Sequence, residues 1–338
     1  MLIGELHARH GKIGRMSERT DTSTELFQHT ARLRQAVSSV VVGKEDQVKI
    51  AVTVLLAGGH LLMEDVPGVG KTVLAKTLAR AMDTKVNRIQ FTPDMLPSDV
   101  TGVAVYDQTA NRFEFQPGPI FANVVIGDEI NRASPKTQSA LLECMEERQV
   151  SVDGETHRLP NPFTVFATQN PTEMEGTYPL PEAQRDRFMA RISMGYPDRE
   201  AELAMLESRD GADPLAALRP VLSADDVRAM IAQVEQVFVA PSVKRYVVDL
   251  ARATREHPAV RVGVSPRASL QLLRAAKAAA AVAGRGYVIP DDVQDLLGPV
   301  FAHRLVLGVR GGRQQTGYAE AERVVSEIAA SVAAPTGA

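Results

Sequence analysis

A glycine-rich turn between a short apolar strand and a helix constrains this chain more than any other feature of its sequence. The strand is expected over residues 60–63 and the helix over residues 73–82, and between them lies the turn Pro67-Gly68-Val69-Gly70-Lys71-Thr72. Backbone N–H groups of such a turn bind phosphate oxygens at the helix N-terminus. Lys71 stands where its charge opposes the helix dipole, so the position predicts an anion beside it.

The turn therefore predicts a nucleotide-phosphate site, in which Lys71 reaches the β- and γ-phosphates and Thr72 coordinates Mg²⁺. The strict pattern has a glycine where this chain has Asp65. Pro67 and Gly68 can still shape the turn, because proline fixes φ and glycine adopts conformations closed to other residues. The competing interpretation is a plain strand–turn–helix that binds nothing, and the flanking strand and helix argue against it.

Two carboxylates, Asp128 and Glu129, follow a second apolar strand that is expected over residues 124–126. Open α/β sheets bind their ligands at the carboxyl ends of the strands. Asp128 is predicted to hold Mg²⁺ through water, and Glu129 to polarise the attacking water as a general base. A strand ending in Asp-Glu is by itself usually a solvated strand end. Together with the glycine-rich turn, it predicts one site for ATP hydrolysis.

Three further polar residues each have a functional and a purely structural interpretation. Asn170 follows an apolar strand and can contact the attacking water or the γ-phosphate, or simply form a turn before proline. Arg187 precedes another strand, where a surface ion pair with Asp186 or a neighbouring residue is the alternative. Arg267 lies in the first turn of a helix capped by Ser265, against the dipole. An ATP phosphate would explain that position, and so would an acidic side chain.

The composition is that of an ordinary globular protein rather than a nucleic-acid or membrane protein. The 38 lysine and arginine residues are outnumbered by 41 acidic ones, and no basic stripe with interleaved aromatic residues occurs. No run approaches the roughly 18 apolar residues of a membrane span. The single Cys144 excludes an internal disulfide and fits a reducing cytosol. The sequence therefore predicts a cytoplasmic protein without nucleic-acid or membrane partners.

The order of strand and helix signals predicts two domains. Residues 1–22 are expected to be a disordered leader, with Met16 as an alternative start, and residues 333–338 a tail. Residues 23–196 alternate strands and helices, which predicts an αβα core with a parallel sheet. Two hairpins are expected within it, around the turns 107–112 and Asp153-Gly154. Residues 197–332 are expected to be entirely helical, over residues 199–208, 224–237, 241–257, 267–283, 290–306 and 319–332.

Taken together, residues 24–310 resemble the MoxR family of AAA+ ATPases. The resemblance rests on a long, ordered set of stretches: LLMEDVPGVGKT, RIQFTPDMLPSDVTG, FQPGPIFANVVIGDEINRASPKTQSALLECMEE, FATQNPTEMEGTYPLPEAQRDRF and VSPRASLQLLRAA. The family is similar in fold to the magnesium-chelatase ATPase subunit. The resemblance implies an αβα core with two inserted hairpins and a helical lid. The segment after Arg310 matches no part of the family pattern.

The resemblance also implies a role for each matching residue. Asn170 matches the first sensor of the family, Arg267 the second sensor, and Arg187 the arginine finger that enters a neighbour's site. Arg185 stands where the family usually has an apolar residue, which leaves two candidates for the finger. Asp128 and Glu129 match the metal-binding and base positions. The implied nucleotide contacts are Val41, Val42 and Gly43 at the adenine, and Pro67, Gly68, Val69, Gly70, Lys71, Thr72 and Leu74 at the phosphates.

The implied activity is Mg²⁺-dependent ATP hydrolysis by a homo-oligomeric ring, a hexamer, that remodels, matures or activates partner complexes. The family's partners typically carry a von Willebrand factor A domain. The hairpin tips look polar, which favours remodelling by contact over threading of a chain. The alternatives are a nucleic-acid motor or loader, and an ATP-gated scaffold with little turnover. Metal insertion into a tetrapyrrole is a further variant, although no metal-ligand cluster is visible in the sequence.

Overall fold

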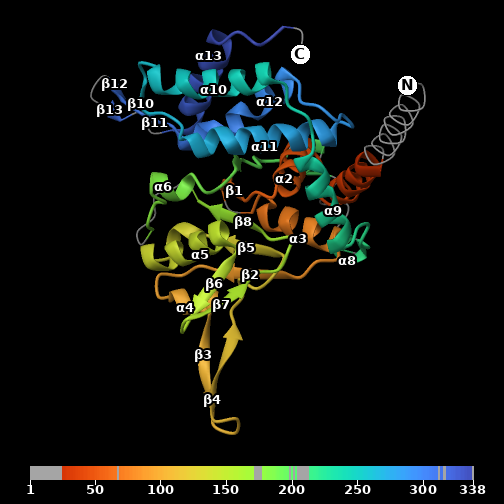
Figure 1. Ribbon diagram of the computed structural model, residues 1–338, viewed down its shortest axis with the longest axis vertical. Coiled ribbons are helices and arrows are strands. Elements are labelled where there is room, and N and C mark those ends of the chain that lie inside the picture. The colour runs from red at the N-terminus through yellow and green to blue at the C-terminus, as the bar shows by residue number, and fades with distance from the viewer. Residues whose placement is uncertain are drawn as a thin grey trace, which may run out of the picture.

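Five parallel strands form the central sheet, in the order β2-β5-β8-β1-β9. The computed structural model describes residues 25–66, 68–170, 177–197, 199–200, 202–203, 213–310, 313–314 and 317–336 (Figure 1). The strands are β1 (Leu61–Glu64), β2 (Val86–Gln90), β5 (Val124–Asp128), β8 (Thr164–Gln169) and β9 (Ala190–Ile192). β5 is buried along its whole length, as expected of a parallel strand covered on both faces. The predicted α/β core is confirmed.

Helices cover the two faces of this sheet in separate layers. Leu61 and Met63 of β1 pack with α2 (Glu45–Leu56) and α3 (Lys71–Ala81), whereas Leu62 packs on the other side with α5 (Pro135–Glu147). Successive side chains of a strand point to opposite faces, so one short apolar strand serves both layers. Ser134 caps α5 as predicted, because its hydroxyl accepts a hydrogen bond from the Thr137 N–H.

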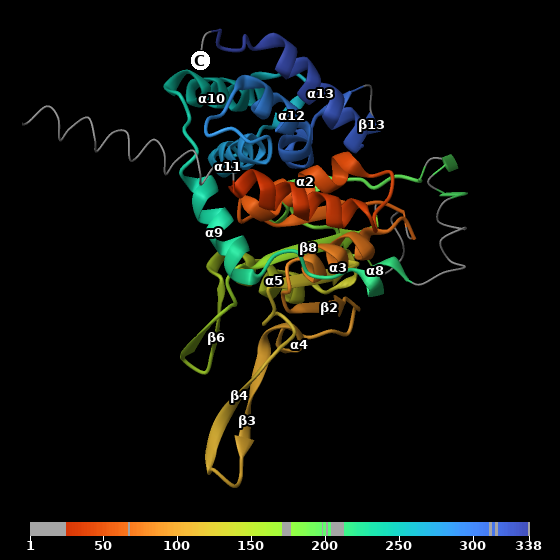
Figure 2. The same ribbon diagram turned by 90° about the vertical axis from the view of Figure 1, so that its right-hand side faces the viewer.

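Both predicted hairpins form. The first pairs β3 (Gly102–Asp107) with β4 (Arg112–Pro117), and it projects far from the body (Figures 1 and 2). The second pairs β6 (Gln149–Val152) with β7 (Glu155–Arg158) across a turn in which Asp153 and Gly154 both have positive φ, as a type I′ turn requires. The two hairpins touch where the rings of His157 and Phe115 stack 3.9 Å apart.

The turn of the longer hairpin is polar, as expected, but apolar side chains that the sequence analysis did not single out lie directly behind it. Tyr106 and Phe113 flank its polar turn and form an edge-to-face pair with ring centroids 5.2 Å apart. Phe113 is 69% exposed, and Val103 and Val105 on the same ribbon are also exposed. The turn residues themselves are polar, but pairing of the strands brings the two aromatic side chains together just behind them. The hairpin therefore presents an apolar surface near its end.

The region after the sheet is built mainly of helices. They are α8 (Pro214–Ala217), α9 (Ala224–Glu235), α10 (Pro241–Glu256), α11 (Pro266–Val282), α12 (Pro290–Phe301) and α13 (Tyr318–Ser331). Within the described residues, no helix has the length and apolar character needed to cross a bilayer. The predicted leader, Met16 as a start, and most of the predicted helix 199–208 lie outside the described residues.

Several short elements correct the sequence-based expectation. The helix expected over residues 290–306 ends at Phe301, and a 3₁₀ turn, η2 (Ala302–Arg304), follows it. The next residues, β11 (Val306–Leu307), pair with β10 (Val260–Val262), so the region is not entirely helical. β12 (Val309–Arg310) and β13 (Arg313–Gln314) form a second small ladder. Strands of two or three residues are too short to show a periodic pattern.

Three short helical segments were not predicted either, because three to five residues are also too few to show the periodicity of a helix. They are α4 (Pro97–Thr101), η1 (Ile130–Arg132) and α6 (Glu182–Arg185).

The helical lid shares one hydrophobic core with the α2 side of the sheet. A single cluster of buried residues runs from Leu74 of α3 through Val52 of α2 to Leu272 and Leu297 of the lid. A second cluster, on the α5 side, contains sheet residues and no lid helix. Because the lid is packed onto the core, it can fix the position of core segments that it touches.

Candidate nucleotide site

The turn that follows β1 has the backbone required for phosphate binding. Gly68 and Gly70 have φ of 87° and 90°, in the region where other residues are strained. A Cβ atom at either position would meet open space, so backbone conformation rather than crowding requires glycine there. Gly70 directly precedes α3, which aims the N-terminal N–H groups of the helix at the turn. Pro67 lies outside the described residues.

Lys71 points its ammonium group into this turn. Nζ donates hydrogen bonds to the carbonyl oxygens of Asp65, at 2.5 Å, and Val66, at 3.1 Å. Burial lowers the pKa of Lys71, and the carboxylates of Asp65 and Asp128 oppose that shift. A partly desolvated cation held among backbone oxygens gains most from an anionic ligand. The turn therefore presents a charge suited to a phosphate group.

Thr72 and Asp128 converge beside the turn. The Thr72 hydroxyl lies 3.3 and 3.4 Å from the two carboxylate oxygens of Asp128, and the Thr168 hydroxyl donates to one of them at 3.3 Å. Hydroxyl and carboxylate oxygens are the ligands that Mg²⁺ prefers, and Mg²⁺ sites at phosphates use few protein ligands. The donor set therefore fits Mg²⁺. The described residues contain no group of three or more His, Cys, Asp or Glu side chains placed to hold a metal by themselves.

Arg88 is a charged neighbour of this site that the sequence analysis missed. Its Nε donates to Asp128 Oδ2 at 2.6 Å, and the arginine side chain is 52% exposed. Arg88 and Gln90 alternate along β2, the strand that pairs with β5, so both lie on the face that carries the site. The sequence does carry a signal for Arg88 and Gln90: polar residues at alternate positions of a strand that precedes the Asp128 strand.

Glu129 has an unusual backbone and a well-defined set of partners. Its φ of 56° and ψ of 50° place a non-glycine residue in the left-handed region. Such strain concentrates at functional sites. The Glu129 N–H donates to the Thr168 hydroxyl at 3.0 Å. Its carboxylate accepts hydrogen bonds from Arg132, at 2.9 Å, and Gln90, at 3.3 Å, and remains 37% exposed.

Asn170 completes the group at the carboxyl edge of the sheet, the edge formed by the ends of the parallel strands. It follows β8, whose last residue, Gln169, pairs in register with Glu64 at the end of β1. Its carbonyl accepts a hydrogen bond from Asn131 at 3.3 Å, which links it to the segment after Glu129. Each of the predicted residues Lys71, Thr72, Asp128, Glu129 and Asn170 thus lies at this edge.

Asp65, the departure from the strict glycine pattern, ties the phosphate turn to the segment after β9. Its carboxylate accepts hydrogen bonds from Val66 N–H at 2.8 Å, Ser193 Oγ at 2.7 Å and Gly195 N–H at 2.5 Å. Partial burial would raise the pKa of Asp65, but these donors outweigh it and hold the pKa below its ordinary value. The segment 193–196 is the start of the connection to the lid.

The predicted adenine-contacting residues lie next to the same segment. Gly43 has a φ of 71°, Val42 is 49% exposed and Val41 is buried, and α2 begins two residues after Gly43. Lys44 donates to the Tyr196 carbonyl at 2.9 Å. Val42 therefore offers an accessible apolar surface two residues before Lys44, which contacts the segment 193–196. Leu74, by contrast, is completely buried, so it supports the first turn of α3 from beneath.

Asp65→Asn is expected to lower both thermal stability and ATP affinity. Asparagine keeps one acceptor oxygen but turns an N–H₂ group toward at least one of the three donors, and each lost hydrogen bond to a charged group costs about 1.5–3 kcal/mol. Because folding lowers the pKa of Asp65 below the ordinary aspartate pKa of 3.8, the carboxylate stabilises the folded protein at neutral pH. This stabilisation is lost progressively as the pH falls below 3.8 and the carboxylate is protonated.

The measurement is urea unfolding of both proteins at neutral pH and near pH 3. The stability difference should be largest at neutral pH and shrink in acid. A constant difference across that range would show that the Asp65 carboxylate is not the stabilising group.

The predicted arginine finger, Arg187, and the predicted second sensor, Arg267, both lie at the opposite, amino edge of the sheet, where the parallel strands begin. Arg187 is two residues before Met189, whose N–H donates to the carbonyl of His60, the residue that precedes β1. Arg267 donates to Glu146 at 2.8 Å near the end of α5, where Met145 contacts His60. Of the two interpretations of Arg267, the acidic partner is the one in this structure. In Figure 1, α6, which leads to Arg187, lies beside the start of α11.

The ion pair expected as an alternative for Arg187 does not form. Asp186 instead pairs with Arg304 of the lid at 2.8 Å. Within the described part of the chain, neither Arg185 nor Arg187 makes an ion pair, and Arg187 Nη1 donates only to the Ala183 carbonyl, at 3.1 Å. Arg185 lines a cavity of 450 Å³ between β9 and the lid, whereas Arg187 does not.

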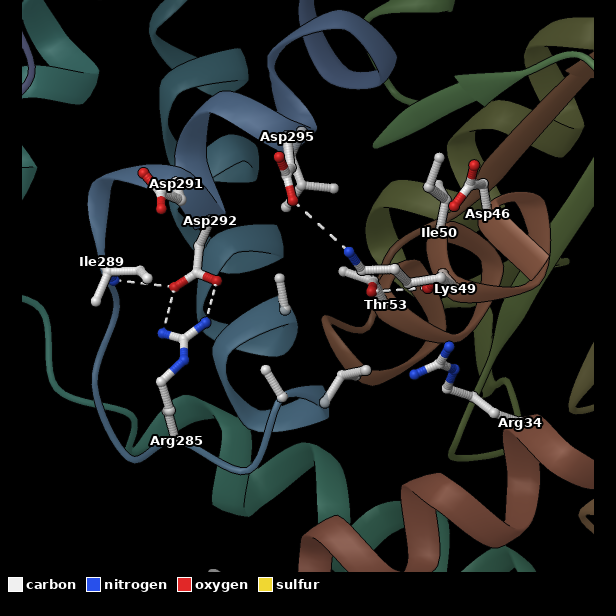
Figure 3. A pocket seen from close by; sticks show the side chains of 14 residues that line it. Arg34, Asp46, Lys49, Ile50, Thr53, Arg285, Ile289, Asp291, Asp292 and Asp295 are labelled. Atoms are coloured by element: carbon white, nitrogen blue, oxygen red, sulfur yellow. Dashed lines mark hydrogen bonds and ion pairs between the residues drawn. The ribbon is translucent and has the colours of Figure 1, made fainter.

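A larger cavity, of 640 Å³, lies between α2, α11 and α12 and contains none of the predicted site residues (Figure 3). Its charged side chains are largely paired with one another. Arg285 holds both carboxylate oxygens of Asp292, at 2.7 and 2.5 Å, and Lys49 lies 3.6 Å from Asp295. This cavity is therefore separate from the nucleotide site.

A parallel sheet with a phosphate turn after β1, acidic residues after β5 and a helical lid defines a P-loop ATPase of the AAA+ class. Two families match the chain: residues 60–190 match the ATPase family associated with various cellular activities (AAA), and residues 252–328 match the AAA lid domain. An uncharacterized protein of Bacillus subtilis, YeaC, is 48% identical over 88% of this chain and 92% of its own length.

A second relative, chaperone MoxR1 of Mycobacterium tuberculosis, is 45% identical over 80% of this chain and 74% of its own length. The crystal structure of a putative ATPase from Cytophaga hutchinsonii superposes with a TM-score of 0.87 at 36% identity, covering 95% of this chain and 99% of that one. The chain belongs to the MoxR family of AAA+ ATPases.

Proposed function

We propose that this chain hydrolyses ATP in a ring of identical subunits, a hexamer, in which each active site is completed by arginines of a neighbour. The ring would use the hydrolysis cycle to remodel, mature or activate partner proteins in the cytoplasm. One observation carries the proposal: Arg187 and Arg267 lie at the amino edge of the sheet, and the phosphate turn lies at the carboxyl edge.

The separation of the two edges argues against a site built within one subunit. The four residues of β1 rise about 3.3 Å each, so the edges are roughly 13 Å apart before the turn is counted. Arg187 is further directed away by its hydrogen bond to its own helix, α6. A head-to-tail contact between copies, repeated around a closed ring, would bring one subunit's amino edge to its neighbour's phosphate turn.

Each residue at the carboxyl edge of the sheet has its own role in the proposed hydrolysis. Lys71 and the N–H groups of the turn bind the β- and γ-phosphates, and Thr72 and Asp128 would hold Mg²⁺, which neutralises phosphate charge when bound. Glu129 takes the proton of the attacking water on its carboxylate, which has acceptor capacity beyond its two present partners. Asn170 orients that water, and Arg187 of the neighbour stabilises charge on the transferred phosphoryl group.

Glu129→Gln is expected to bind ATP like the wild type and to hydrolyse it more slowly by a factor of about 10²–10⁴, as loss of a positioned base does. Glutamine has the same size and can still contact Arg132, but it cannot accept the proton. Phosphate release under saturating ATP measures the rate. Unchanged turnover would remove Glu129 as the base, and negligible turnover in the wild type would favour the scaffold alternative.

The partner proposal combines the family with the exposed hairpin. One relative is named a chaperone, and we infer that this chain acts on a protein with a von Willebrand factor A domain. The ribbon of β3 and β4 offers that protein an apolar contact, because Tyr106 and Phe113 are 46% and 69% exposed. The two rings are in contact with each other, and contiguous exposed apolar surface is typical of interaction sites.

A pull-down with ATP, ADP and no nucleotide is expected to recover such a partner unequally, because a partner can shift the cycle only if its affinity depends on the state. Phe113→Ser should weaken recovery, whereas Phe238→Ser, which changes a similarly exposed phenylalanine of the lid, should not. Equal recovery in the three nucleotide conditions would contradict the coupling of ATP turnover to the partner.

A further inference from the structure

A buried side chain of the lid, Arg304, makes several hydrogen bonds to the segment that carries Arg187. This guanidinium is 2% exposed. Its nitrogens donate to the carboxylate and carbonyl of Asp186, at 2.8 and 3.2 Å, and to the carbonyls of Phe188, at 2.5 Å, and Met189, at 3.2 Å. The hydrogen bonds fall on both sides of Arg187, so they fix the backbone from which that side chain extends.

The same pair also holds the helix that carries Arg267. The second carboxylate oxygen of Asp186 accepts a hydrogen bond from Ser265 Oγ at 2.9 Å. Ser265 is the N-cap of α11, two residues before Arg267. Arg304 in addition donates to Gln271 on that helix. One carboxylate and one guanidinium therefore join the two arginine-bearing segments to each other.

The environment of Arg304 keeps the pair charged and geometrically fixed. Burial lowers the pKa of Arg304 to about 10, against the opposing effect of Asp186, so the guanidinium stays charged at neutral pH. A buried charge must have its donors satisfied, and the planar fork of arginine can reach several fixed acceptors at once. Lysine has no such fork. The site thus demands arginine for its shape as well as its charge.

We propose that Asp186 and Arg304 are positioning residues, which hold Arg187 and Arg267 as one rigid face toward the neighbouring subunit. This inference rests on the proposed sharing of active sites between subunits. If Asp186 and Arg304 have this role, the lid contributes to the face that meets the neighbouring active site, because Arg304 and Arg267 belong to the lid while Arg187 belongs to the core. Neither Asp186 nor Arg304 has a hydrogen bond or ion pair to the described residues of the phosphate turn, so we expect the pair to affect turnover and not nucleotide binding.

The test begins with Arg304→Lys, which keeps a positive charge but cannot span the Asp186, Phe188 and Met189 acceptors. We expect ATP affinity close to that of the wild type and a kcat lower by about 10- to 100-fold, as small displacements of a catalytic group produce. Asp186→Asn should act in the same way and serves if the first variant folds poorly. The matched control is Arg285→Lys, which disturbs another Arg–Asp pair of the lid, the partly exposed Arg285 with the buried Asp292 (Figure 3).

Mixed rings separate positioning from a general structural defect. Arg304→Lys mixed with Lys71→Ala should regain activity, because the Lys71→Ala subunits present an intact arginine face to intact phosphate turns. Arg304→Lys mixed with Arg187→Ala should regain none, because both subunits lack that face. Misfolding or failed assembly of the Arg304→Lys subunit would give no recovery in either mixture, and would overturn the proposal if Asp186→Asn behaved alike.

The reference mixture is Arg187→Ala with Lys71→Ala. If that mixture stays inactive, the shared active site itself is wrong. If it recovers while Arg304→Lys with Lys71→Ala does not, the shared site stands and the positioning role is wrong. Recovery in the mixture of Arg304→Lys with Arg187→Ala would equally contradict the positioning role, since it would show that Arg304→Lys subunits still present a working Arg187.

Discussion

Lys71→Ala is expected to abolish measurable ATP binding, with a loss of at least about 10²-fold in affinity, because two or three charge-assisted hydrogen bonds disappear together. The ammonium lies inside the phosphate turn, where it donates hydrogen bonds to the carbonyl oxygens of Asp65 and Val66. Removing it leaves the backbone N–H groups as the main phosphate ligands. Titration with a fluorescent ATP analogue measures the effect.

Lys76→Ala is the matched control, because it removes the same charge from the same helix, α3, away from the turn. Its affinity for ATP should stay close to that of the wild type. Equal losses in the two variants would mean that Lys71 contributes only general charge, and near-normal binding by Lys71→Ala would place the nucleotide elsewhere.

Arg187→Ala is expected to bind ATP normally and to lose about 10³–10⁵ in hydrolysis rate, the range found for arginine fingers. Arg187 has no hydrogen bond to the phosphate turn as far as the turn is described, so binding should be preserved. Arg185→Ala is the informative comparison. Arg185 lines a cavity beside the lid, so its loss should affect turnover far less. The reverse ranking of the two variants would assign the finger to Arg185.

Much of the nucleotide site could be predicted because its signals are local. The phosphate turn, the Asp128-Glu129 pair and Asn170 each follow an apolar strand, and parallel strands bring such ends to one edge. Asp65 departs from the strict glycine pattern, yet the phosphate turn still forms. Its backbone does not have the positive φ that would demand glycine, and its carboxylate makes hydrogen bonds that glycine could not make.

The parts that sequence reasoning missed depend on contacts between distant residues. Arg304 and Asp186 are 118 positions apart, so no local pattern connects them. The pairing of β10 with β11 joins strands of three and two residues, which are below the length at which alternation can be seen. The aromatic pair on the long hairpin escaped because Tyr106 and Phe113 become neighbours only once the strands pair.

The claim that active sites are shared between subunits is tested most directly by mixing Lys71→Ala with Arg187→Ala, each inactive alone. Different affinity tags on the two variants and purification through both would confirm that mixed rings form. In a randomly mixed ring of equal proportions, about a quarter of the interfaces join an intact Lys71 to an intact Arg187. The account predicts that ATP hydrolysis returns to about that fraction of the wild-type rate. Mixed rings that form and remain inactive would contradict it.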